Sequence, residues 1–61
     1  MNEQPLRVLL VDDDRELCEE LADLLREQYS YVVDTAADGS RAWERVIHAE
    51  RPYHVALIDD L

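Results

Sequence analysis

The 61-residue chain contains no lysine, one cysteine, one glycine and two prolines. A single cysteine cannot form a disulfide within the chain, so a small fold must rely on its hydrophobic core, a metal or a partner chain. The lone thiol also agrees with a reducing compartment. Few glycines and prolines leave little room for a flexible linker. Because compact domains most often have roughly 100–150 residues, the sequence predicts one small domain or a piece of a larger one.

Long apolar runs and positive charge are scarce as well. No segment approaches the roughly 18 apolar residues that span a bilayer, and the start, MNEQPLR, lacks the features of a secretory leader. We therefore expect a cytoplasmic protein. The 15 acidic residues outnumber the 6 basic ones, all arginine, and give a formal net charge of −9 at pH 7. This charge repels phosphate backbones and anionic lipids, so direct binding to nucleic acid or a membrane is not expected.

Two aliphatic runs predict buried strands. Leu6 to Val11 reads LRVLLV and is followed by three aspartates, and Val55 to Ile58 reads VALI and is followed by Asp59 and Asp60. Each run is too short for a helix and is apolar on both faces of an extended chain. Burial on both faces requires helices above and below the sheet.

Two helices and a third strand are predicted between these runs. Apolar residues recur at helical spacing in residues 14–28 and again in residues 40–50, where Arg51-Pro52 ends the pattern. The segment YVVDTA, residues 31–36, is rich in β-branched residues but interrupted by Asp34, as expected of the least buried strand at a sheet edge. The β-α-β-α-β alternation predicts an α/β fold with a parallel sheet.

The aspartates that follow the two apolar strands are the candidate site. In parallel α/β sheets, ligands bind beyond the carboxyl ends of the strands. If the two strands are neighbours, Asp12, Asp13 and Asp59 converge in one crevice, where each carboxylate pair at about 4 Å costs on the order of 4 kcal/mol unless a proton or cation is present. Oxygen ligands without histidine or cysteine favour Mg²⁺. Alternatively, the aspartates only cap a helix and line a solvated turn.

At this point the sequence resembles the receiver domain of two-component response regulators. VLLVDDD is similar to the family's first strand with its acidic pair, VVDTAADGSRAW to its second strand and second helix, and RPYHVALIDDL to its third strand with the phosphoacceptor. The resemblance covers the whole chain and implies that residues 1–61 are the N-terminal portion of a receiver domain. It also implies a flavodoxin-like doubly wound parallel sheet, with only β-α-β-α-β of the full (βα)₅ fold present here.

The resemblance implies a role for each matching aspartate. Asp59 would accept a phosphoryl group from a sensor histidine kinase or phosphotransfer protein, so the domain would be a phosphoacceptor rather than an enzyme. Asp13 would bind Mg²⁺ directly, Asp12 directly or through water, and Leu61 through its backbone carbonyl. The family's Thr or Ser after the fourth strand and its Lys after the fifth fall outside these 61 residues, so the chain itself is expected to be impaired. In the family's strand order the third strand would be an exposed apolar edge, which predicts self-association.

Three other interpretations compete. In a haloacid-dehalogenase-like phosphatase, Asp12 would be the nucleophile and Asp14 its companion, but the residues after Asp14 depart from that pattern. An EF-hand is disfavoured because Leu17 stands where the loop needs glycine. In an interaction module, the fold is kept without phosphorylation. No functional role is expected for His48 or His54, while Cys18 is expected in the core and Trp43 partly packed on the sheet.

Overall fold

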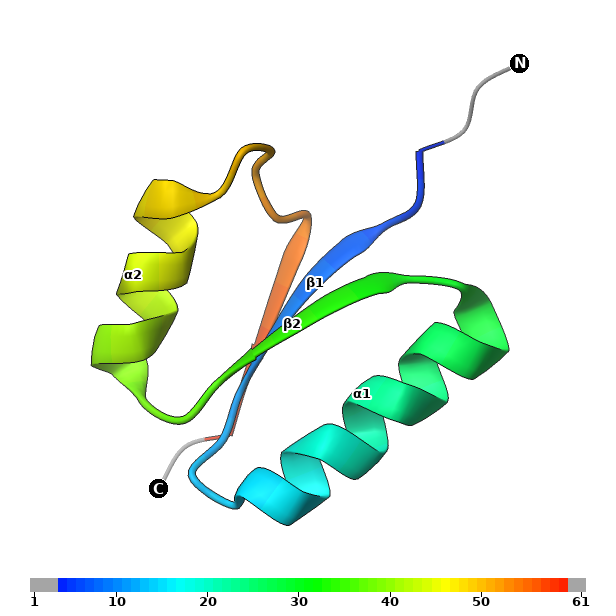
Figure 1. Ribbon diagram of the computed structural model, residues 1–61, viewed down its shortest axis with the longest axis horizontal. Coiled ribbons are helices and arrows are strands. Elements are labelled where there is room, and N and C mark those ends of the chain that lie inside the picture. The colour runs from blue at the N-terminus through cyan, green and yellow to red at the C-terminus, as the bar shows by residue number, and fades with distance from the viewer. Residues whose placement is uncertain (1–3, 60–61) are drawn as a thin grey trace.

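Three parallel strands and two helices alternate along the chain. The computed structural model describes residues 4–59 (Figure 1). The elements are β1 (Arg7–Val11), α1 (Arg15–Tyr29), β2 (Val32–Ala36), α2 (Gly39–His48) and β3 (Val55–Ile58). The predicted α/β class and the order of elements are confirmed, and the bounds of each element lie within two residues of those expected.

β1 is the central strand of the sheet. The strand order is β2-β1-β3, and β1 pairs in parallel with both neighbours. Val11, at the end of β1, pairs with Ala36 on one side and Ile58 on the other. The two apolar strands are therefore neighbours, as predicted, and their carboxyl ends lie at the same edge of the sheet.

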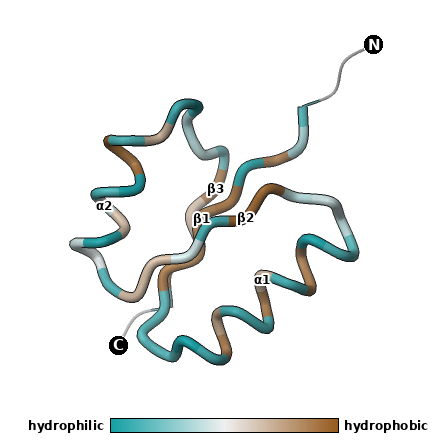
Figure 2. The backbone as a smooth tube through the Cα atoms, in the orientation of Figure 1, coloured by the Kyte–Doolittle hydropathy of each residue, from teal (hydrophilic) through white to brown (hydrophobic). Residues whose placement is uncertain are grey.

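The two helices cover opposite faces of the sheet (Figure 1). Alternate residues of β1 point to opposite faces, as the pleat of a strand requires. Val8 and Leu10 pack with Cys18 and Ala22 of α1. The intervening residues, Leu9 and Val11, belong to a second cluster, which includes Ala36, Ala42 of α2 and Tyr53. Figure 2 shows these hydrophobic strand residues gathered between the helices.

Aspartate side chains begin both helices. Asp14 Oδ1 accepts a hydrogen bond from the Leu17 amide at 3.1 Å, and Asp38 Oδ1 accepts one from the Arg41 amide at 2.8 Å. These bonds satisfy amides that have no partner within the first helical turn. α1 ends at Ser30, whose left-handed backbone (φ 58°) directs its amide to the Arg26 carbonyl at 3.0 Å.

The expectation that YVVDTA is the least buried strand is wrong. β2 contains two buried residues, whereas all four residues of β3 are exposed and Ile58 is 67% exposed. Both helices lie over β1 and β2 and neither packs against β3. β3 therefore matches β1 in composition but not in burial.

Trp43 also differs from its expected place. Its side chain is 64% exposed, and α2 contains no buried residue. α2 approaches the sheet through half-buried Ala42 and through Arg45, whose Nε donates to the Thr35 carbonyl at 3.2 Å. Trp43 follows Ala42 by about 100° of helix rotation, which turns its ring away from that contact. In the part of the chain that the structure describes, no helix has the length and apolar character needed to cross a membrane.

Candidate functional site

Asp12 and Asp59 lie side by side at the carboxyl edge of the sheet. Asp12 follows β1, and its amide donates to the Ala36 carbonyl at 3.1 Å. Asp59 follows β3, and its amide donates to the Val11 carbonyl at 2.9 Å. Backbone hydrogen bonds thus hold the two residues on adjacent strands, as the sequence predicted for the ends of neighbouring parallel strands.

The carboxylate of half-buried Asp12 is already oriented by the loop that follows it. Its Oδ1 accepts a hydrogen bond from the Asp14 amide at 2.9 Å. This local turn is typical of aspartate and leaves the other oxygen available for a ligand. Asp14 differs, because its own Oδ1 caps α1 through the Leu17 amide. The capping interpretation therefore holds for Asp14, while Asp12 faces the edge of the sheet.

The remaining predicted ligands are less well defined. Asp13 is exposed in the turn before α1. Among residues 4–59, no three Asp, Glu, His or Cys side chains form a group that could hold a metal ion. Without a cation, carboxylates repel one another, and exposed side chains separate. Leu61, with its backbone carbonyl, and Asp60 lie outside the described residues, so their predicted contributions stay predictions.

A small cavity of about 250 Å³ connects Asp12 and Asp59 on the α1 face of the sheet. The rest of its lining is mainly apolar and includes Leu10, Leu21 and Leu57. Cys18 also lines it and is buried, as predicted, with Sγ 3.9 Å from the Leu10 carbonyl. Burial, followed by the negative charge of Asp12, raises the pKa of the Cys18 thiol. Cys18 is therefore a neutral core residue and a poor metal ligand.

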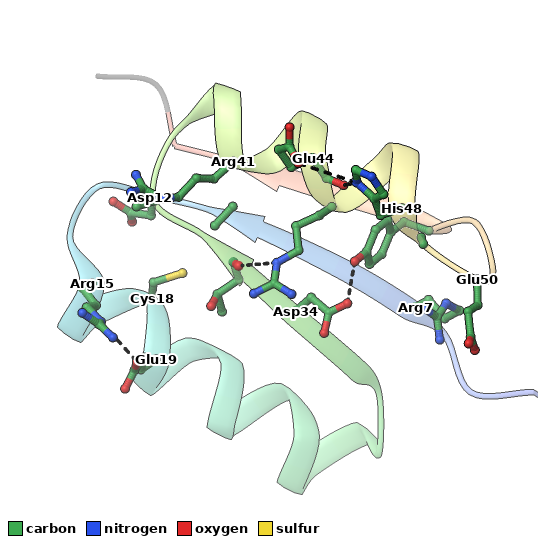
Figure 3. A pocket seen from close by; sticks show the side chains of 16 residues that line it. Arg7, Asp12, Arg15, Cys18, Glu19, Asp34, Arg41, Glu44, His48 and Glu50 are labelled. Atoms are coloured by element: carbon green, nitrogen blue, oxygen red, sulfur yellow. Dashed lines mark hydrogen bonds and ion pairs between the residues drawn. The ribbon is translucent and has the colours of Figure 1, made fainter.

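A larger groove of about 840 Å³ reaches Asp12 from the other side (Figure 3). Its walls mix charges of both signs, so it lacks the single-sign lining that would select an ion by charge alone. Its charged residues are Arg7, Asp12, Arg15, Glu19, Asp34, Arg41, Glu44, Arg45 and Glu50.

A tyrosine–aspartate pair closes part of this groove. The Tyr53 hydroxyl donates to Asp34 Oδ2 at 2.5 Å, and the Arg7 guanidinium lies 5.6 Å from the centre of the Tyr53 ring (Figure 3). Burial and the bond to Asp34 both raise the pKa of Tyr53 from its usual value of 10.0. Asp34 interrupts the apolar pattern of its strand because it receives this bond.

Contacts of this kind have no signal in the sequence. Arg26 from α1 and Arg45 from α2 donate to backbone carbonyls of β2, and His54 Nδ1 accepts from the Arg7 amide at 2.9 Å. Each joins residues far apart in the chain, without a motif or fixed spacing. Exposed His48 has Nδ1 3.0 Å from the Glu44 carbonyl, which agrees with the solvated role expected of it.

The comparisons leave the resemblance to receiver domains without independent support. No family model, no curated protein and no solved structure matches the chain.

Proposed function

We propose that this chain is the N-terminal portion of a receiver domain, in which Asp59 accepts a phosphoryl group from a histidine kinase or phosphotransfer protein. The observation that carries the proposal is the placement of Asp12 and Asp59 on adjacent parallel strands, next to each other at the carboxyl edge. The β2-β1-β3 order agrees with a flavodoxin-like doubly wound sheet, of which β-α-β-α-β is present here.

The residues at this edge fit Mg²⁺ by their donor chemistry. Asp12 keeps one carboxylate oxygen free of the loop, and Asp59 is exposed beside it. Mg²⁺ is commonly held by one or two carboxylates together with several waters, so a preformed cage of three side chains is not required. Asp13 and the Leu61 carbonyl are the further ligands in this proposal. The bound ion would neutralise negative charge on the transferred group.

In the proposed reaction, one Asp59 carboxylate oxygen attacks phosphorus in line with the P–N bond of a phosphohistidine. An O–P bond forms, the P–N bond breaks, and its electron pair stays on the imidazole nitrogen. Asp59 lies at the end of an edge strand, where a donor can approach it. No lysine is present to stabilise the transferred group, so we expect slow transfer for this chain alone.

Incubation with phosphoramidate, which carries the same P–N bond, tests the proposal. Intact-mass spectrometry should detect one acid-labile, Mg²⁺-dependent phosphoryl group, absent from Asp59→Asn and retained by Asp23→Asn, an exposed aspartate on α1. Labelling that survives Asp59→Asn would overturn the assignment. Labelling lost only in Asp12→Asn would instead support the dehalogenase-like interpretation. A folded chain that is not labelled at all would favour the interaction module.

A further inference from the structure

The two edges of the sheet differ in how their backbone groups are used. At the β2 edge, the amide of Val32 and the carbonyl of Ala36 bond inward to β1. Backbone groups alternate along a strand, so those of Val33 and Thr35 point outward. Arg26 Nη2 donates to the Val33 carbonyl at 2.5 Å, and Arg45 Nε donates to the Thr35 carbonyl at 3.2 Å.

The β2 edge is therefore covered from both faces of the sheet. Arg26 reaches it from α1 and Arg45 from α2, and the two helices lie on opposite faces. The guanidinium groups occupy the outward carbonyls and place positive charge beside them. Charged side chains at an edge are a recognised means of preventing strand addition.

The β3 edge has no such cover. The Asp59 amide bonds inward to Val11, so alternation turns the backbone groups of Ile58 and Ala56 outward. Within residues 4–59, no side chain makes a hydrogen bond to this outer edge. The strand carries no charge, and its larger side chains, Val55, Leu57 and Ile58, are 38%, 46% and 67% exposed.

We propose that β3 pairs with β3 of a second copy of this chain, forming a closed dimer with a six-stranded sheet. A two-fold axis makes the two strands antiparallel and lets each edge supply the donors and acceptors that the other lacks. An uncharged strand is a suitable partner for itself even in a chain of net charge −9. Because the arginines cover the other edge, each copy has one open edge and assembly stops at two.

The alternation also specifies the register. Opposing the outward residues Ala56 and Ile58 of the two copies gives two reciprocally hydrogen-bonded pairs. Each pair sets a small side chain against a large one on the α2 face. Leu57 then lies opposite Leu57 of the second copy in a non-hydrogen-bonded position, where Cα atoms are about 4.5 Å apart. That separation is within the range that a disulfide can bridge.

Sedimentation equilibrium of the 61-residue chain tests the stoichiometry. The mass should rise with concentration from 7.1 kDa to twice that value and stop there. Ile58→Lys places a charge at an already exposed edge position and should leave a folded monomer by circular dichroism. Ile47→Lys, at a residue of α2 that is 51% exposed, should still form dimers. A monomer at millimolar concentration, or a dimer unaffected by Ile58→Lys, would overturn the proposal.

Two further variants test the register and the closure. In a Cys18→Ala background, oxidised glutathione should cross-link Leu57→Cys into a disulfide dimer and leave Ile47→Cys uncross-linked. The double substitution Arg26→Met and Arg45→Met should uncover β2 and allow species larger than a dimer. Equal cross-linking of the two cysteine variants would refute the register. A folded double variant that still stops at two would refute closure by the arginines, and pairing with an added foreign strand in place of self-association would refute the choice of partner.

Discussion

Tyr53 and Asp34 are joined by a hydrogen bond that passes over β1. Tyr53 lies just before β3 and Asp34 lies within β2, so the bond connects the two outer strands on the α2 face of the sheet. The same ring packs against Leu9 and Val11 of the central strand. One side chain therefore links all three strands where α2 provides little cover.

Removing the Tyr53 hydroxyl should lower the stability of the fold. We expect Tyr53→Phe to reduce the free energy of unfolding by about 1 kcal/mol, because the partly buried Asp34 carboxylate loses its donor. Urea unfolding followed by circular dichroism measures the change. Tyr29→Phe is the matched control, since Tyr29 is 60% exposed and contacts Tyr31 by ring stacking. Equal effects of the two substitutions would show that the hydrogen bond contributes nothing.

The same bond predicts a loss of stability at high pH. The raised pKa of Tyr53 means that folding favours its neutral form. Its contribution is complete below the unfolded pKa of about 10 and is lost as pH rises through the higher folded pKa. Absorbance titration of tyrosinate should show one of the three phenols ionising late, and Tyr53→Phe should remove that step. A late step that persists in Tyr53→Phe would assign it to another tyrosine.

At low pH, Asp38 should determine how well α2 begins. The backbone bond from Arg41, reinforced by the guanidinium of the same residue, lowers the pKa of Asp38. The cap therefore stabilises α2 above the usual aspartate range and is lost as pH falls through the folded pKa. Exchange of the Arg41 amide should speed up on acidification. Asp38→Ser keeps a capping oxygen without a titrating group, so its Arg41 amide should respond less; an unchanged response would contradict this assignment.

Asp12 and Asp14 should respond differently to Mg²⁺. Asp12→Asn removes a carboxylate at the sheet edge and should weaken Mg²⁺ binding about tenfold or more, because direct attraction to the cation exceeds about 1.4 kcal/mol. Asp14→Asn keeps the helix cap, for which asparagine is as effective as aspartate, and should change binding little. Amide chemical shifts during a Mg²⁺ titration provide the measurement. Equal weakening in both variants would indicate diffuse charge attraction rather than a site.

Cys18 should be protected from thiol reagents in the folded state. Its side chain is 4% exposed, and burial together with nearby carboxylates raises its pKa, so both access and thiolate formation are suppressed. We expect labelling by a disulfide reagent at neutral pH to follow unfolding of the chain, and to accelerate in proportion as urea populates the unfolded state. Rapid labelling in native buffer would place Cys18 at the surface.

Local patterns were sufficient to predict the elements and their order. Six-residue and four-residue aliphatic runs defined β1 and β3, and the three- and four-residue apolar spacing defined α1. The aspartates that follow β1 and β3 could be assigned to one edge because parallel strands align their carboxyl ends. These inferences need only the residues of each element and the rules of chain connection.

Burial could not be predicted in the same way. β1 and β3 are both aliphatic, yet β1 has a strand on each side and two helices over it, whereas β3 has neither cover. The exposure of Trp43 depends on how α2 rotates about Ala42 and Arg45, which tertiary contacts decide. The Tyr53–Asp34 bond and the two arginines on β2 depend on register and side-chain length, and no local spacing encodes them.

The central place of β1 has a kinetic consequence. Val8 pairs with Val33 of β2 across one helical crossover and with Val55 of β3 across two, and the longer loop costs more entropy to close. The cluster formed by β1, α1 and β2 includes five buried residues and none from β3. Folding should therefore begin with β1, α1 and β2, and β3 should add last. In reverse, β3 is the first element to open in the native state, and its amides should exchange before those of the other strands.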